Sequence, residues 1–222
     1  MLWRGEHMKE VEIDTKEATV KEKSFAREAV EWILCFIAAF VVAMIVRYFL
    51  FTPTLVCQTS MTPTILDGER VLVNRLVRTF KLPLQRNDIV TFEKPDNTVS
   101  GCGHYNEISG VGEFIFHNVI EIGKISYIKR VIALEGEHVK IEGGKVYVDG
   151  RERLEPYLNG ITTPVTGDYC DIVVPEGHVF VMGDNRGGSS DSREFGCIPI
   201  EKIEGRVSTR IWPLSAFGKI DE

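Results

Sequence analysis

The segment that most constrains this chain is an apolar run at residues 32–51, WILCFIAAFVVAMIVRYFLF, in which Arg47 is the one charged residue. About 20 mostly apolar residues let a helix cross the hydrocarbon core of a bilayer. Arg47 stands near the end of the run, where its long stem can carry the charge to the interface. A core helix would show a polar face. A cleavable leader would be shorter and end in a small-x-small site, whereas TPTL follows here at 52–55. The run therefore predicts an uncleaved anchor at 31–51.

Basic residues flank this run unevenly, which predicts its orientation. The first basic residue after the run is Arg70, whereas several precede it closely: Lys16, Lys21, Lys23 and Arg27. Segments rich in Lys and Arg stay in the cytoplasm. We therefore expect a single-pass protein of the cell membrane, with a cytoplasmic tail at 1–30, the anchor at 31–51 and an extracytoplasmic domain at 52–222.

Charge and cysteine content limit the possible partners. The formal net charge of -6 argues against a nucleic-acid partner, because such binding needs a concentrated basic surface. Cys35 is inside the run, and the remaining cysteines allow three pairings if all are oxidised: Cys57, Cys102, Cys170 and Cys197. A metal could use Cys102 with His104 and His117, but the spacing matches no standard zinc pattern. We expect no metal and no cofactor.

Beyond the run, short segments rich in β-branched and aromatic residues alternate with turn residues, which is typical of strands. Two of them, 138–141 and 145–148, flank Gly143-Gly144, a hairpin signal. The other expected strands are 70–73, 88–92, 127–134, 179–182 and 206–212. The predicted fold class is mainly β, an antiparallel all-β domain preceded by one transmembrane helix. Residues 97–124, with a further strand at 113–122, have the character of an insertion.

Ser60 stands in CQTSMTPTIL at 57–66, a stiff loop that contains proline and follows the apolar run. It is either part of a plain polar loop or a nucleophile, and a nucleophile needs a base. A Ser-His-Asp triad needs a histidine held by a carboxylate. None of the histidines stands in a comparable motif: His7, His104, His117, His138 and His178. A Ser-Lys pair needs only a desolvated lysine within hydrogen-bond reach of the serine.

Lys129 is the candidate base. In an extended strand, Tyr127, Val131 and Ala133 share its face, so its amine is expected to be desolvated. Burial disfavours the charged form of a lysine and lowers its pKa, which would let the neutral amine accept a proton. The alternative is that Lys129 lies on an edge strand and extends its charge into solvent.

A third candidate segment, MGDNRGGSSDSR at 182–193, follows a predicted strand. Its small, turn-forming and charged residues predict a compact loop held by side-chain hydrogen bonds. An ordinary acidic loop or a calcium loop are the alternatives. Arg186 and Arg193 argue against calcium, because calcium sites gather oxygens without nearby cations.

These segments resemble the four conserved boxes of bacterial type I signal peptidases, in the same order: SMTPT at 60–64, NDIV at 87–90, YIKRV at 127–131 and GDNRGGSSDSR at 183–193. The preceding apolar run matches too, so the resemblance covers about residues 32–212. It implies a membrane-anchored serine endopeptidase that cleaves after small-x-small sites. The implied partners are the signal peptides of exported preproteins and the lipid bilayer.

The resemblance also implies roles for individual residues. Ser60 would be the nucleophile, Lys129 the general base and Ser189 the hydroxyl that orients the lysine amine. Met61 and Pro63 are expected to hold the serine loop at the bilayer surface. The implied supporting residues are Arg130 beside the lysine, Asp184 and Arg186 in the loop, and the ion pair of Asp191 and Arg193.

The chain departs from the family pattern in three places. The family often has Ser, Thr or Gly two residues before the nucleophile, where this chain has Gln58. Either the Gln58 amide donates to the oxyanion, or this side chain points to solvent and backbone amides serve instead. The second box reads Arg86-Asn87-Asp88, without the usual glycine. The insertion at 97–124 has no counterpart in the smallest members.

Two other functions fit parts of the chain. Self-cleaving repressor proteases also use a Ser-Lys pair, but they carry a DNA-binding domain in place of the apolar run. A catalytically silent, membrane-anchored binding or scaffold module would keep the anchor and the fold. The intact set of Ser60, Lys129 and Ser189 favours the enzyme.

Overall fold

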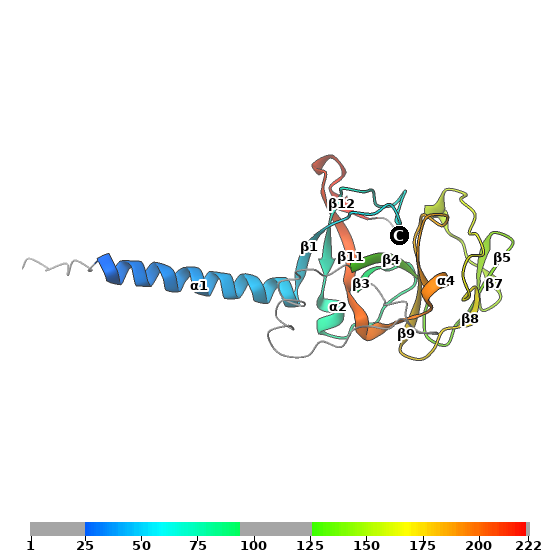
Figure 1. Cartoon of the computed structure of the whole chain (residues 1–222), viewed down its shortest axis with the longest axis horizontal. Helices are drawn as coiled ribbons and strands as arrows, with labels where there is room; N and C mark the ends of the chain where they lie inside the picture. Colours follow the sequence, from blue (N-terminus) through cyan, green and yellow to red (C-terminus); the bar gives the residue numbers. More distant parts are fainter. Residues whose placement is uncertain (1–24, 94–125, 221–222) are drawn as a thin grey trace, which may run out of the picture. The chain divides into compact units, whose positions relative to one another are not determined.

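The computed structural model describes residues 25–93 and 126–220. Two compact units share the chain, one formed by residues 1–40 and the other by 41–222, and the boundary between them falls inside helix α1. Helix α1 spans Phe25–Phe49 (Figure 1). It begins before the anchor expected at 31–51 and ends earlier, because Phe51 is the first residue of strand β1.

Helix α1 has the length and composition of a membrane span. Its segment Arg27–Phe49, 23 residues long, is apolar enough to cross a bilayer, and none of that segment is buried by the described protein. At about 1.5 Å per residue it would extend about 35 Å, slightly more than the hydrocarbon core. Trp32, Phe36 and Phe40 are among its exposed side chains. A buried core helix would not leave such side chains uncovered.

The C-terminal end of α1 is capped by the domain that follows. The last carbonyls of a helix have no partners within the helix and need donors from elsewhere. Short helix α2, Leu76–Thr79, the preceding Arg75 and the more distant Thr52 supply them. The donors are Thr52 Oγ1 to Arg47 O (2.9 Å), Arg78 Nη2 to Tyr48 O (2.9 Å), Thr79 Oγ1 to Phe49 O (2.8 Å) and Arg75 N to Leu50 O (2.8 Å).

The larger sheet has eight antiparallel strands, which confirms the predicted all-β class for the described part of the domain. Its order is β1-β2-β11-β3-β4-β9-β10, with β12 paired to β11. The strands are β1 Phe51–Leu55, β2 Arg70–Asn74, β3 Ile89–Glu93, β4 Ser126–Ala133, β9 His178–Met182, β10 Ile198–Pro199, β11 Ile203–Trp212 and β12 Gly218–Lys219. The strand expected at 113–122 and the insertion expected at 97–124 both lie outside the described residues.

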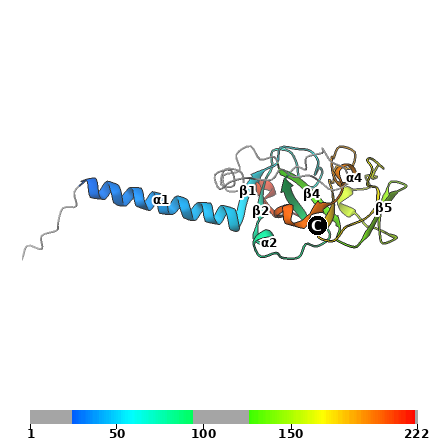
Figure 2. The ribbon, with the colours of Figure 1, turned by 60° about the horizontal axis from the view of Figure 1, so that its bottom comes forward.

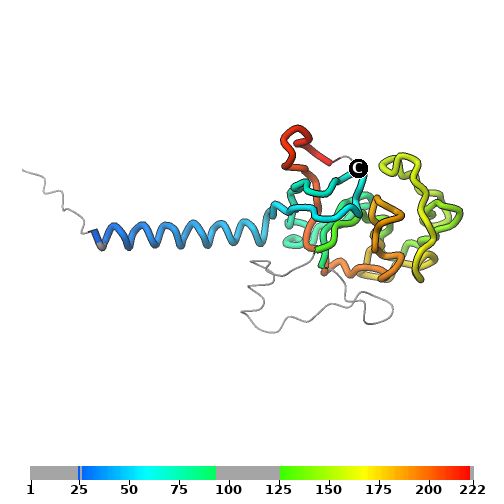
Figure 3. Tube along the Cα trace, turned by 45° about the horizontal axis from the view of Figure 1, so that its top comes forward, coloured from blue at the N-terminus to red at the C-terminus, as the bar shows by residue number. Residues whose placement is uncertain are grey.

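The second sheet has four strands in the order β7-β6-β5-β8. Figure 2 shows β5 beside the α4 segment at one side of the domain, and Figure 3 shows the C-terminal hairpin, in red, at another. Gly143 (φ 59) and Gly144 (φ 79) join β5 to β6, and positive φ at both positions is what a tight hairpin turn requires. The predicted hairpin is therefore confirmed. The elements are β5 His138–Glu142, β6 Lys145–Val148, β7 Arg151–Glu152, β8 Asp171–Val173 and α4 Ser192–Phe195.

Strand β4 crosses the middle of the larger sheet and contributes to two hydrophobic cores. Val131 packs in a cluster with Val90 and Phe92, whereas Ala133 packs in the cluster that fills the space toward the second sheet. A β-bulge between Val131 and Ala133 breaks the alternation. The expectation that Ala133 shares the face of Lys129 is therefore wrong, because the bulge turns the end of the strand. Tyr127 does share it, with the Lys129 amine 4.8 Å from its ring centroid.

Candidate active site

Ser60 lies in the loop between β1 and β2, and its loop is fixed by the core beneath it. Met61 and Ile65 are fully buried and belong to one hydrophobic cluster with Val71 of β2. Ile65 N donates to Met61 O at 2.9 Å, which closes a helical turn just after the serine. Met61 therefore points into the protein, which corrects the expectation that it holds the loop at the bilayer surface. Pro63 is exposed.

Lys129 of β4 reaches Ser60 across 69 positions of sequence. Its Nζ donates to Ser60 Oγ at 2.8 Å and to Ile128 O at 3.0 Å. The side chain is buried, with 1% exposed, as expected for a strand in the middle of a sheet. Burial lowers the pKa of Lys129 to about 8, and the carboxylates of Asp191 and Asp184 oppose this shift. The edge-strand alternative is thereby excluded.

Ser189 lies in the loop after β9. It is buried, and its Oγ has no hydrogen-bond partner within the described residues, so a bond to the Lys129 amine is not formed in this structure. The Oγ packs against Gly183. A Cβ on Gly183 would lie 2.2 Å from Ser189 Oγ and 2.5 Å from Ser60 O, so only glycine fits between the two serines.

Two buried ion pairs support the loop after β9. Arg130 donates to both carboxylate oxygens of Asp184, at 2.9 and 2.8 Å, and Arg193 donates to both of Asp191, at 2.8 Å each. All four side chains are almost fully buried. Asp191 also accepts a hydrogen bond from Gly183 N at 3.0 Å, which fixes the backbone beside the serines. Buried charges of this kind are tolerated because each is paired and hydrogen-bonded.

The same loop holds the serine loop directly. Asp184 accepts a hydrogen bond from Thr64 Oγ1 at 2.6 Å. Asn185 N donates to Ser60 O at 3.0 Å, and its side-chain amide donates to Thr59 O at 3.2 Å. Sequence reasoning gave no role to Thr64 or Asn185, although both stand inside the boxes.

A segment outside the boxes completes the support. Glu155 accepts hydrogen bonds from Arg186 at 2.9 and 2.6 Å, and Thr163 accepts one from the same guanidinium. The centroid of the Tyr157 ring lies 3.9 Å from the Arg130 guanidinium carbon, and the Tyr157 hydroxyl donates to Glu155 at 2.7 Å. No sequence motif marks Glu155 or Tyr157, so these contacts were not predictable from the boxes.

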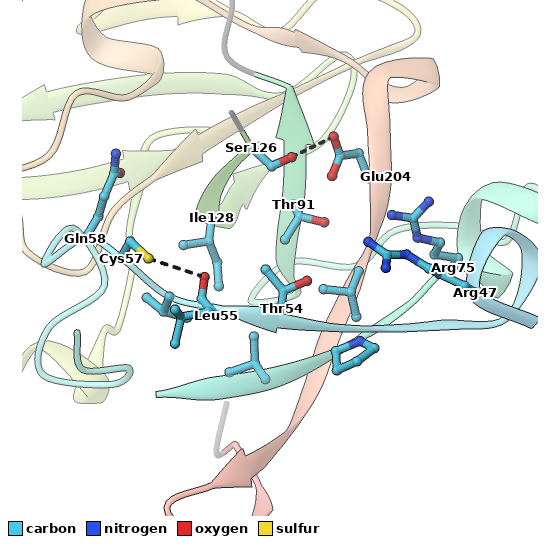
Figure 4. Close-up of a pocket in the computed structure, with 14 residues that line it drawn as sticks. Arg47, Thr54, Leu55, Cys57, Gln58, Arg75, Thr91, Ser126, Ile128 and Glu204 are labelled. Carbon is cyan, nitrogen blue, oxygen red and sulfur yellow. Dashed lines mark hydrogen bonds between the residues drawn. The ribbon is translucent and has the colours of Figure 1, made fainter. Parts of the chain in front are cut away.

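A cavity of about 410 Å³ opens beside the serine loop. One end is lined by Cys57, Gln58 and Ile128, close in sequence to Ser60 and Lys129 (Figure 4). The Gln58 side chain is exposed, so it is accessible to a bound peptide. Strand β1 forms one wall and lies at one of the two edges of the larger sheet, as far as the structure describes it.

The described cysteines form no disulfide with one another: Cys35, Cys57, Cys170 and Cys197. Cys102, His104 and His117 lie outside the described residues, and the described part of the chain holds no cluster of three or more metal-ligating side chains.

Comparison with known proteins identifies the family. The family described as signal peptidase, peptidase S26, matches residues 29–212. Signal peptidase IB of Staphylococcus aureus (strain COL) is 34% identical over 206 residues, which cover 86% of this chain and 93% of that protein. Signal peptidase I of Bacillus licheniformis is 34% identical over 199 residues, covering 86% and 92%. A crystal structure of a signal peptidase I from Enterococcus faecalis is 28% identical, with a TM-score of 0.39, and covers 56% of this chain and 97% of that one. The chain belongs to the signal peptidase family, peptidase S26.

Proposed function

We propose that this chain is a membrane-anchored serine endopeptidase that removes signal peptides from exported preproteins, with Ser60 as nucleophile and Lys129 as general base. The observation that carries the proposal is the 2.8 Å contact between the Lys129 amine and the Ser60 hydroxyl. The amine is buried and its pKa is lowered to about 8. About a tenth of such an amine is neutral at pH 7, which is enough for it to act as a base.

The reaction follows from that contact. The neutral amine of Lys129 takes the proton of the Ser60 hydroxyl as Oγ attacks the scissile carbonyl carbon. The tetrahedral intermediate collapses to an acyl-enzyme, and the lysine ammonium gives its proton to the leaving amine of the mature protein. Water then attacks the ester, again with Lys129 as base, and releases the signal peptide with a free carboxylate.

Ser189 is proposed to orient the amine. Its hydroxyl is buried beside Gly183 and lacks a partner in the described structure, so it is available to a nearby polar group. A small rotation of the Lys129 side chain during the proton transfers would let this hydroxyl share the amine. The buried pairs Arg130–Asp184 and Arg193–Asp191 are proposed as supports.

The oxyanion needs at least two donors. The backbone N–H of Ser60 supplies one, and the exposed amide of Gln58 at the end of the cavity is the proposed second. Gln58 has a long side chain where the family often has a hydroxyl or glycine. To donate to the oxyanion, this side chain must fold back over the scissile carbonyl of the substrate.

The substrate is proposed to bind as an extended strand. Within the described residues β1 has a neighbour on one side alone, so its other side can pair with a peptide, and the adjoining cavity can hold alternate side chains. This arrangement suits the small-x-small pattern, in which two side chains on one face of the peptide are small. The relatives named signal peptidase I and IB support this substrate class.

The proposed location is the cell membrane. Helix α1 would span the bilayer, with a cytoplasmic tail at 1–30, an anchor at 31–51 and the domain 52–222 outside. Protease added to intact spheroplasts should then remove a tag placed after Glu222. A tag that stays protected until the membrane is lysed would contradict this topology.

The decisive experiment is cleavage of a purified preprotein by the full-length protein in detergent, with the product identified by mass spectrometry. A new N-terminus directly after a small-x-small sequence, absent with Ser60→Ala, is the expected result. An intact preprotein bound without cleavage by the folded wild-type chain would instead indicate the silent scaffold module.

A further inference from the structure

The cavity beside the serine loop has a second end that the proposed peptidase reaction does not use. Arg47 and Arg75 line this end together with Thr91 and Glu204. Figure 4 shows the two arginine side chains at the side of the cavity opposite Gln58, with their guanidinium groups directed toward Thr91. The charged lining residues are thus all at one end.

This end carries an excess of positive charge. Arg75 is 2% exposed, yet it lies among other cations. Burial first, and then the positive charges of Arg78 and Arg47, lower the pKa of Arg75 to about 10, while Glu204 acts in the opposite direction. Arg75 therefore stays protonated at neutral pH beside two further arginines and one carboxylate. An anion bound here would relieve the repulsion among the guanidinium groups.

Thr91 of β3 supplies a second, independent observation. It is 3% exposed, and its Oγ1 has no hydrogen-bond partner within 25–93 and 126–220. Buried hydroxyl groups are nearly always hydrogen-bonded, so a hydroxyl left without a protein partner in a cavity wall is open to a water or to a ligand oxygen. A phosphate in this end of the cavity would face the Thr91 hydroxyl and the guanidinium groups of Arg47 and Arg75, which line the same space.

The position of the site in the chain indicates which anion is at hand. Arg47 is in the last turn of α1, at the end of the segment that is long enough to span a bilayer. Next to it, the Arg78 guanidinium carbon lies 4.6 Å from the centre of the Tyr48 ring. Tyrosine and arginine at the end of a membrane span are typical of the headgroup level. The anions concentrated at that level are lipid phosphates.

We propose that Arg47, Arg75 and Thr91 bind the phosphate group of an anionic phospholipid in the leaflet at the C-terminal end of α1. Guanidinium groups bind phosphate through paired, charge-assisted hydrogen bonds, and the threonine hydroxyl donates one more. The proposal rests on the proposed membrane span of α1, and it does not depend on the role of Ser60 or Lys129.

Native mass spectrometry of the full-length protein tests this directly. The protein is placed in nanodiscs of equimolar dioleoylphosphatidylcholine and dioleoylphosphatidylglycerol, released from them, and the lipid retained on each molecule is counted. The wild type should retain phosphatidylglycerol in preference to phosphatidylcholine. Arg47→Gln and Arg75→Gln should each retain about fivefold less, the equivalent of about 1 kcal/mol per arginine. Arg151→Gln, which changes an exposed arginine of β7, is the matched control and should retain as much as the wild type.

Arg47 is exposed, so Arg47→Gln keeps the test valid even if replacement of the buried Arg75 prevents folding. Unchanged retention in Arg47→Gln, or an equal loss in Arg151→Gln, overturns the proposal. Excess inorganic phosphate should not displace the lipid, and displacement would mean a site for free phosphate instead. Peptide cleavage, measured on the same samples, reports on Ser60 separately, so failure of one proposal is distinguishable from failure of the other.

Discussion

The Nζ of Lys129 lies 2.8 Å from the Oγ of Ser60, although β4 and the serine loop are far apart in the chain. Strand β4 presents the lysine from the middle of the larger sheet, and the buried Met61 and Ile65 hold the loop above it. The contact is thus made between two segments that are each anchored in the core. Such anchoring holds the amine and the hydroxyl at hydrogen-bond distance during both acylation and deacylation.

Ser60→Ala should lower kcat by on the order of a thousandfold or more, because it removes the proposed nucleophile. The change removes one nearly buried hydroxyl and introduces no larger group, so the melting temperature should stay close to that of the wild type. Cleavage of a fluorogenic signal-sequence peptide measures the effect. Ser190→Ala, in an exposed serine, is the control, and activity of Ser60→Ala above a tenth of wild type would rule out this nucleophile.

The pH dependence of kcat/KM should report the Lys129 amine. Its pKa is lowered, so the neutral, active form gains population as pH rises through about 8 and is lost as pH falls below it. Activity should therefore climb with pH on the acid side and level off above about 8. A flat profile between pH 6 and 9 in stopped-time peptide assays would argue against the lysine as base.

Lys129→Arg should be inactive at every accessible pH, because a guanidinium stays protonated and cannot accept the serine proton. Lys140→Arg, at a half-exposed lysine of β5, should keep full activity and the wild-type pH profile. If Lys129→Arg cleaved the peptide and its activity fell at low pH as in the wild type, a residue other than Lys129 would be the base.

Ser189→Ala should reduce kcat by up to about 100-fold with little change in KM, since a misdirected amine slows proton transfer without weakening peptide binding. It should also shift the acid limb of the pH profile, which a purely structural role would leave in place. Ser190→Ala, one residue away and exposed, is the matched control. If Ser189→Ala had a wild-type kcat and an unchanged acid side of its pH profile, Ser189 would have no role in orienting the lysine amine.

Gln58→Ala should lower kcat on the order of 100-fold or more, about 3 kcal/mol, if its amide donates to the oxyanion. KM should change little, because this donor acts on the charge that develops during the reaction. Gln85→Ala, at another exposed glutamine, is the control. A kcat of Gln58→Ala within about threefold of the wild-type value would mean that backbone amides, and not Gln58, stabilise the oxyanion.

Asp184→Asn should lower the free energy of unfolding by about 3–5 kcal/mol, because it leaves the Arg130 guanidinium buried without its counter-charge. It should also release the Thr64 contact to the serine loop, so that activity falls with stability. Urea titration measures the loss. Glu142→Gln, which breaks the exposed Lys140 pair, should cause no measurable change.

Much of this architecture was predictable, for physical reasons that differ from one element to the next. The hairpin around Gly143-Gly144 is a local signal, and the contact between Ser60 and Lys129 followed from box order and a desolvated strand position. The side that Met61 faces was not predictable, because an apolar side chain in a loop suits a protein core as well as a lipid surface. Burial in the core decided it.

The supports around the loop after β9 were predictable only in part. Asp191 and Arg193 are two residues apart, so their ion pair is local. Glu155 and Arg186 are separated by 31 positions, and only the folded chain brings them together. The orientation of Ala133 was also not predictable. The β-bulge that turns it to the other face of β4 leaves no clear pattern in the sequence.

The capped end of α1 has a practical consequence for anyone who wishes to produce this enzyme without its membrane segment. A truncation that starts at Thr52 would delete the backbone carbonyls at 48–50 that accept hydrogen bonds from Arg75, Arg78 and Thr79. These three donors would then lose their partners at the new N-terminus. A truncation that starts at Val41, where the compact unit begins, keeps those acceptors and Arg47. The shorter protein should aggregate on concentration, and the longer one should stay monodisperse in mild detergent.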